Sequence, residues 1–151
     1  MKKTIILAIA AMFTGACSIA QIQEGEQYTG TSMDLLQDNQ DIHARLLEGK
    51  LEVMITAKGE KCVGSFQYLD SDKSYLGFTT ASNNYVGKFK GKFGPACEAA
   101  VGTKAGTEIT VQVARLGGLL GTSIMSSTAI RICEDAEGVC FPKNTFKVTL
   151  N

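Results

Sequence analysis

The stretch KLEVMITAKGEKCVGSFQY, which runs from Lys50 to Tyr68, decides the fold class of this chain. In its first half every second position is apolar, at Leu51, Val53 and Ile55. A tight turn over Ala57 to Glu60 follows, and the returning half places a second set on one face: Cys62, Gly64, Phe66 and Tyr68. A period of two on both sides of a turn predicts a β-hairpin.

The same alternation recurs along the rest of the chain. Further strands are predicted over Tyr75–Thr80, Tyr85–Phe93, Glu108–Arg115, Thr128–Cys133 and Phe146–Leu150, with turns at Asp70–Asp72 and Ser82–Asn84. These segments indicate an all-β fold, a small antiparallel sandwich or barrel of about seven or eight strands. Glycines inside the segments, at Gly64, Gly77, Gly87 and Gly91, favour strong curvature and a barrel-like closure.

The segment from Ser32 to Glu48 is the exception to this period. Its apolar residues are compatible with one short helix near residues 42–47, ended by Gly49. The polar cluster Asp38–Asp41 instead favours a turn between two short strands. Of the two, the short helix is the prediction.

The N-terminus has the layout of a bacterial export signal. Lys2 and Lys3 precede a charge-free apolar run, and small residues lead to Cys17. The run Gly15-Ala16-Cys17 resembles the lipobox of bacterial lipoproteins, although Thr14 stands where Leu is usual. The resemblance implies that residues 1–16 are removed and that Cys17 is acylated. A cut after Ala20, which releases a soluble periplasmic or secreted protein, is the alternative.

This layout divides the chain into three parts. Residues 1–16 are the signal, residues 17–27 a polar tether, and residues 28–151 one β domain. If the lipoprotein resemblance holds, Ser18 implies sorting to the outer membrane, with the domain facing the periplasm or the cell surface. The anchor on Cys17 makes the membrane one expected partner.

Four cysteines remain after either cut, at Cys62, Cys97, Cys133 and Cys140. An even number outside the cytoplasm predicts two disulfides. Neighbouring cysteines are the natural pairs, Cys62 with Cys97 and Cys133 with Cys140. Four cysteines nevertheless allow three connectivities, and the sequence leaves the choice open.

A resemblance to a known family lies near the C-terminal end of the sequence. It is carried by the run Ile130-Arg131-Ile132-Cys133 and by the later run Gly138-Val139-Cys140-Phe141-Pro142. Together they resemble the end of the periplasmic N-terminal domain of the DsbD family of thiol–disulfide reductant carriers. The resemblance covers about 20 residues and implies an immunoglobulin-like fold, with Cys133 and Cys140 as an electron-passing redox pair. The acidic residues between them, Glu134, Asp135 and Glu137, disfavour the thiolate that exchange requires. A structural disulfide is therefore preferred, and a periplasmic thiol-exchange module is the alternative function.

Charge excludes one class of partner. Removal of Lys2 and Lys3 with the signal leaves 13 basic residues against 15 acidic ones, a net charge of −2, whereas a general nucleic-acid binder carries a basic surplus. A local basic stripe at Lys88, Lys90 and Lys92 is a candidate contact for an anionic glycan, a lipid headgroup or an acidic protein. The glycine-rich apolar run that contains Leu119 and Leu120 is the second contact candidate, if it is exposed.

No catalytic set emerges from the sequence. His43 is the only histidine, so a histidine-rich zinc site cannot form, and neither a metal nor a cofactor is expected. A serine nucleophile elbow is absent. The expected function is therefore non-enzymatic: an exported envelope lipoprotein whose disulfide-braced β domain binds a protein partner, in an inhibitory, immunity or assembly role.

Overall fold

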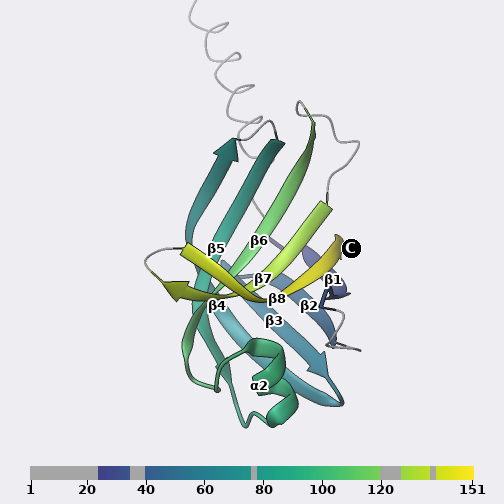
Figure 1. The fold of residues 1–151 in the computed structure, drawn as a ribbon, viewed down its shortest axis with the longest axis vertical. Helices are drawn as coiled ribbons and strands as arrows, with labels where there is room; N and C mark the ends of the chain where they lie inside the picture. The colour runs from purple at the N-terminus through teal and green to yellow at the C-terminus, as the bar shows by residue number, and fades with distance from the viewer. Residues whose placement is uncertain (1–23, 35–39, 76–77, 120–126, 137–138) are drawn as a thin grey trace, which may run out of the picture.

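A computed structural model describes residues 24–34, 40–75, 78–119, 127–136 and 139–151. The described residues form one antiparallel sheet in which each strand pairs with the next and the last pairs with the first, so that the sheet closes into a barrel (Figure 1). The strands are β1 (Gln27–Ser32), β2 (Gln40–Leu47), β3 (Lys50–Ala57), β4 (Glu60–Tyr75), β5 (Phe78–Lys90), β6 (Glu108–Leu119), β7 (Ser127–Ala136) and β8 (Val139–Leu150). The all-β prediction is confirmed, and of the two expected architectures the barrel is observed.

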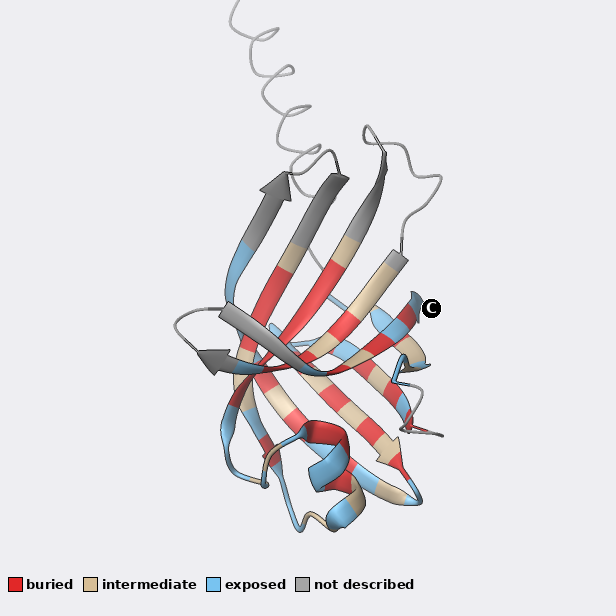
Figure 2. Cartoon of the chain, viewed as in Figure 1, coloured by how far each residue is buried: buried red, intermediate tan, exposed pale blue. Residues whose placement is uncertain are grey.

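Closure of the single sheet into a barrel excludes a two-sheet sandwich. The immunoglobulin-like fold implied by the DsbD resemblance has two packed sheets, whereas these strands form a single closed one. Buried and less buried residues alternate along the strands in Figure 2, as expected when one face of each strand lines the interior. Phe66 and Phe89 meet edge to face inside the barrel, with ring centroids 5.1 Å apart.

Two of the strand glycines are sites of close backbone approach. A Cβ on Gly87 would lie 2.2 Å from the carbonyl oxygen of Ser65 on β4, and a Cβ on Gly64 would lie 2.8 Å from the ring of Phe66. A side chain at either position would therefore force the strands apart or displace the aromatic core. The glycines let the sheet curve tightly around that core.

One end of the barrel is covered by a short helix, α2 (Pro95–Val101), which contacts β3, β4 and β8 (Figure 1). The sequence analysis missed this helix, although Pro95 at its first turn and Gly102 in the left-handed region after its last residue are typical helix boundaries. Cys97 in α2 is disulfide-bonded to Cys62 on β4. The carboxylate of Glu60 accepts a hydrogen bond from the Cys97 backbone N–H at 3.0 Å, so it caps the helix N-terminus.

Asn144 on β8 fixes the other end of α2. Its Nδ2 donates to the Ala100 carbonyl at 3.0 Å and to Gln40 Oε1 on β2 at 2.7 Å, and its Oδ1 accepts from the Ser32 hydroxyl at 2.9 Å. Asn144 is only 4% exposed. One buried amide therefore ties α2, β1, β2 and β8 together.

The predicted helix at residues 42–47 is wrong, because these residues belong to β2. Burial along β2 alternates strictly, with Gln40, Ile42, Ala44 and Leu46 facing the core. Ile42 pairs with Ile55 on β3, and Ala44 pairs with Val53. The apolar spacing of residues 42–47 is compatible with a helix or a strand. The cross-strand contacts with β3 favour the strand.

The predicted turn at Asp70–Asp72 and the predicted separate strand at Tyr75–Thr80 are also wrong. β4 continues through the first segment to Tyr75, and the second spans the end of β4 and the start of β5. A register shift between Tyr68 and Asp70 marks a bulge where the turn was expected.

The predicted turn at Ser82–Asn84 is wrong for a related reason. Asn83 and Asn84 lie within β5 and are only 2% and 8% exposed. Asn84 donates to Asp70 at 2.7 Å, and Asn83 accepts from the Ser71 hydroxyl at 2.6 Å. Satisfied side-chain hydrogen bonds to β4 allow turn-forming residues to stay in a strand.

Candidate binding surfaces

One of the predicted disulfides joins α2 to β4. The structure joins Cys62 to Cys97, with Cα atoms 5.7 Å apart, which is one of the pairings that the sequence left open. Cys133 is 1% exposed and is also disulfide-bonded. The side chain of Cys140 lies outside the described residues, so its pairing with Cys133 stays a prediction. The register of the β7–β8 hairpin pairs Cys133 with Pro142 and places Cys140 two residues away on the same strand.

The basic stripe is exposed but differs from its predicted form. Lys88 and Lys90 lie on β5, and both are exposed. Lys92 follows the end of that strand, beyond Gly91 in the left-handed region (φ 93°). The alternation of the stripe therefore ends at Lys90. Lys92 is in the connection that leads to α2.

β4 adds two residues that the sequence analysis did not select. Val63 pairs directly with Lys90 and is 46% exposed, and exposed Lys61 stands two residues before it on the same face. We call the set Lys61, Val63, Lys88 and Lys90 the lysine surface. Among the described residues, none of its three lysines forms an ion pair. The outward-facing positions of β4 are visible in the alternating sequence. Only the pairing register of β4 with β5 shows that they adjoin Lys88 and Lys90.

The second predicted contact cannot be assessed in the same way. Leu119 is the last residue of β6, at the end of the strand away from α2, and its side chain lies outside the described residues, as does Leu120. The segment is therefore a strand as far as Leu119.

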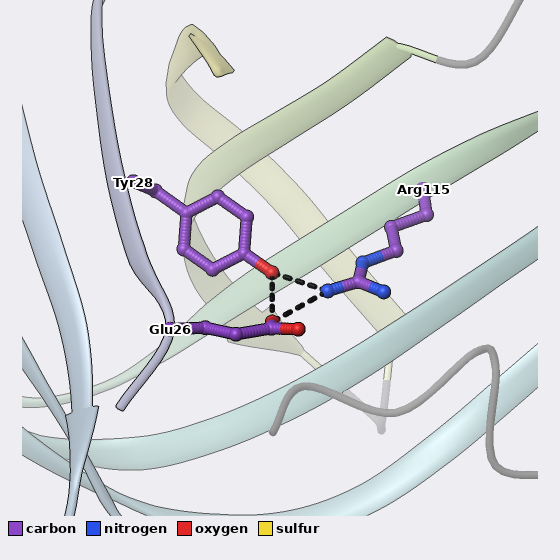
Figure 3. Close-up of polar contacts among 3 residues, drawn as sticks. All are labelled: Glu26, Tyr28 and Arg115. Carbon is purple, nitrogen blue, oxygen red and sulfur yellow. Dashed lines mark hydrogen bonds and ion pairs between the residues drawn. The ribbon is translucent and has the colours of Figure 1, made fainter. Parts of the chain in front are cut away.

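A polar cluster of Glu26, Tyr28 and Arg115 joins the segment before β1 and β1 itself to β6 (Figure 3). Arg115 on β6 forms an ion pair with Glu26 at 2.7 Å and donates a hydrogen bond to the Tyr28 hydroxyl, and that hydroxyl donates to Glu26 at 2.6 Å. The Arg115 guanidinium also lies 5.9 Å from the centre of the Tyr28 ring. Because the three side chains contact one another, the cluster fastens the segment before β1 to β6.

Burial changes the acid–base behaviour of two tyrosines near this cluster. Loss of hydration raises the pKa of the Tyr28 hydroxyl to about 12, and its hydrogen bond to Glu26 acts in the same direction. Burial likewise raises the pKa of Tyr85 to about 12, with a smaller contribution from neighbouring Tyr68. Both hydroxyls therefore stay protonated well above neutral pH, and the Tyr28 hydroxyl serves as a structural hydrogen-bonding group.

His43 lies on the outer wall, in a shallow hollow of about 490 Å³. The hollow is lined by threonine side chains, Asp41 and Met54, and by Gly30. Neither the Asp41 carboxylate nor the His43 ring forms a hydrogen bond with another described residue, and no serine lines the hollow. The described residues therefore show no catalytic triad around His43.

The described ranges contain neither a candidate metal site nor a candidate membrane-spanning helix. No group of three or more His, Cys, Asp or Glu side chains there could hold a metal ion. No helix in that part of the chain has the length and apolar character needed to cross a bilayer.

No protein-family model, curated protein or solved structure matches this chain.

Proposed function

We propose that this chain is an exported, lipid-anchored binding domain of the bacterial envelope, which holds an acidic protein partner through its lysine surface. Cys17 carries the anchor in this proposal, and Ser18 directs the protein to the outer membrane. The observation that carries the proposal is the Cys62–Cys97 disulfide, since such bonds persist in oxidising compartments outside the cytoplasm.

The lysine surface supports a binding role because its charges are available. Its three lysines have no ion-pair partner among the described residues, and they surround Val63, which leaves nearly half of its surface in contact with water. An apolar centre with a charged rim is the usual plan of a protein contact. Basic charge attracts acidic partners and speeds their association.

The rigidity of the wall adds to this support. Lys61 and Val63 flank Cys62, whose disulfide fixes this part of β4 to α2. The contact residues are therefore held in place before binding, which reduces the entropy lost when a partner docks.

Burial of Cys133 favours binding over thiol exchange. Exchange requires an attacking thiolate to reach a disulfide sulfur, and only 1% of the surface of Cys133 is exposed. The Cys133 disulfide is therefore assigned a structural role in this proposal.

Site-specific photo-crosslinking in intact envelopes tests the contact. A photoreactive benzoylphenylalanine replaces Val63 in one strain and Met33, which is 58% exposed and follows the end of β1, in a control strain. We expect a discrete adduct with an acidic protein from position 63 and none from position 33.

A charge-reversed pair sharpens the result. Lys61→Glu with Lys90→Glu should abolish the adduct at position 63, whereas Lys147→Glu, which reverses an exposed lysine on β8, should leave it unchanged. An adduct of equal yield in all three backgrounds would overturn the assignment of the lysine surface.

A further inference from the structure

Tyr85 is a core residue whose hydroxyl is left without a hydrogen bond. The residue is only 3% exposed, and its hydroxyl bonds to none of the described residues. Every described side-chain nitrogen or oxygen that is fully shielded from solvent has a partner, so the unpaired Tyr85 oxygen must still touch solvent. This hydroxyl can therefore bond to a ligand that approaches from outside.

Tyr85 lies towards the end of the barrel that α2 does not cover. Its direct partner on β4 is Tyr68, six residues beyond the Cys62 that is bonded to α2, which is about 20 Å along a strand. β3 begins at Lys50, whose partner on β4 is Gln67, so Tyr68 is the first residue of β4 past its pairing with β3. From there β4 and β5 continue beyond the β2–β3 turn (Figure 1).

Tyr68 presents an aromatic surface beside this hydroxyl. Directly paired residues share one face of a sheet, so Tyr68 points to the same side as Tyr85, yet it is 50% exposed. The two rings meet edge to face, with centroids 5.8 Å apart. The Tyr68 hydroxyl is hydrogen-bonded to Ser71 at 2.6 Å, and Ser71 donates in turn to Asn83. These bonds hold the ring in place while half of its surface contacts water.

The charges near the Tyr85 hydroxyl are balanced within the fold. Arg115 is two residues beyond core residue Val113 on β6, so it faces the same interior, where it forms its ion pair with Glu26. Burial raises the pKa of Tyr85 most, followed by nearby Tyr68. Arg115 then lowers this pKa and Glu26 raises it, so both charges lie within electrostatic reach of the hydroxyl. A charged ligand would compete with their ion pair, whereas a neutral one would not.

These features together select a neutral ring that carries hydroxyl groups. An apolar ligand such as an acyl chain would cover the Tyr85 hydroxyl without bonding to it, which is unfavourable. A sugar ring has hydroxyls that can both donate to and accept from a tyrosine hydroxyl. Its C–H face is apolar and can pack against an aromatic ring such as that of Tyr68. A few polar groups on an aromatic wall are typical of small-molecule sites.

We propose that the end of the barrel away from α2 binds a neutral sugar ring, with the Tyr85 hydroxyl as its hydrogen-bonding group and the Tyr68 ring as its packing surface. The lysine surface lies on the outer face of β4 and β5, where its members alternate with buried residues. The sugar site is therefore separate from it. The proposal depends neither on the protein partner assigned to that surface nor on acylation of Cys17.

Titration of the full-length protein, purified from its envelope, tests the site. The probes are two neutral disaccharides, maltose and chitobiose, with benzene as a ring without hydroxyls and glucuronate as a charged sugar. Binding is followed by calorimetry and by NMR of labelled tyrosine rings, because the chain has only four tyrosines to assign. We expect at least one disaccharide to shift the signals of Tyr68 and Tyr85, and benzene and glucuronate to bind more weakly.

Two variants test the assigned roles. Tyr85→Phe keeps the ring and removes one hydrogen bond to the sugar, so binding should weaken by about 3- to 10-fold. Its urea midpoint at neutral pH should not fall, because the hydroxyl has no partner among the described residues. Tyr68→Ala should weaken binding by about tenfold. The control Met33→Ala, at a 58% exposed position after the end of β1, should bind as wild type does.

Three results would overturn the proposal. The first is the absence of a shift at Tyr68 and Tyr85 with both disaccharides up to tens of millimolar. The second is tighter binding of benzene or glucuronate than of either disaccharide. The third is equal disaccharide affinity in wild-type protein and Tyr85→Phe, which would remove the hydroxyl from the site.

Discussion

Replacing Cys62 and Cys97 together with alanine is expected to lower the free energy of unfolding by about 4 kcal/mol at 25 °C. The bond joins residues 35 positions apart, and closing a loop of that length removes this much conformational free energy from the unfolded chain in the loop-entropy model. The folded state changes less, because the Glu60 cap and the buried Asn144 amide still hold α2 in place. A domain of this size has a total stability of about 5–15 kcal/mol, so the loss is a large fraction.

Urea unfolding followed by far-ultraviolet circular dichroism measures this effect. We expect a lower midpoint and a steeper dependence on urea, since the uncrosslinked unfolded chain exposes more surface. Wild-type protein serves as the reference, and both samples are kept without reductant so that the Cys133 bond stays intact. A loss below about 1 kcal/mol would refute the reasoning, because the bond would then not restrain the unfolded chain.

Three further predictions address the barrel itself. Raising the pH from 10 towards 12 should lower the free energy of unfolding by up to about 3 kcal/mol each for Tyr28 and Tyr85, because the folded state then retains protons that the unfolded state releases. Below pH 10 neither tyrosine makes the free energy of unfolding depend on pH. The Tyr28→Phe variant should lose the part of the pH dependence that Tyr28 causes, as measured by urea unfolding at a series of pH values. Gly30→Ala should cost more than about 2 kcal/mol in thermal unfolding, since the new Cβ would lie 1.9 Å from the Lys147 carbonyl oxygen, and an unchanged melting temperature would contradict this close approach. Asn144→Ala should cost about 2–3 kcal/mol and speed amide exchange in α2 above that in β3, whereas a uniform change would contradict its role as a tie to the helix.

The alternating segments were predictable because alternation and burial coincide in them. Between Lys50 and Phe66 the buried positions are apolar or glycine, and the turn at Lys58-Gly59 adopts the left-handed conformation that hairpin turns of two residues require. The barrel closure was indicated by strand glycines, of which Gly87 does sit at a close backbone approach.

The errors arose where tertiary partners override local preference. Asn83 and Asn84 are turn formers, yet β4 supplies hydrogen-bond partners that keep them in β5. The residues of β2 carry no unambiguous period until Ile42 and Ala44 are placed against β3. Such partners are separated from them along the chain, so no local pattern encodes them.

The candidate binding surface was only partly predictable for the same reason. Lys88 and Lys90 are recognisable in the sequence as a basic stripe. Val63 can be assigned to the same surface only once its pairing with Lys90 on the neighbouring strand is known. The ion pair of Glu26 with Arg115 likewise joins opposite parts of the chain across the barrel.

The measurement that tests the account most directly is the intact mass of the protein taken from its native envelope fraction, without reductant, followed by peptide mapping. The account predicts a chain that begins at an acylated Cys17 and contains two disulfides, one of them between Cys62 and Cys97. A chain that retains residues 1–16 with free thiols at Cys62 and Cys97 would contradict both export and the disulfide-braced barrel.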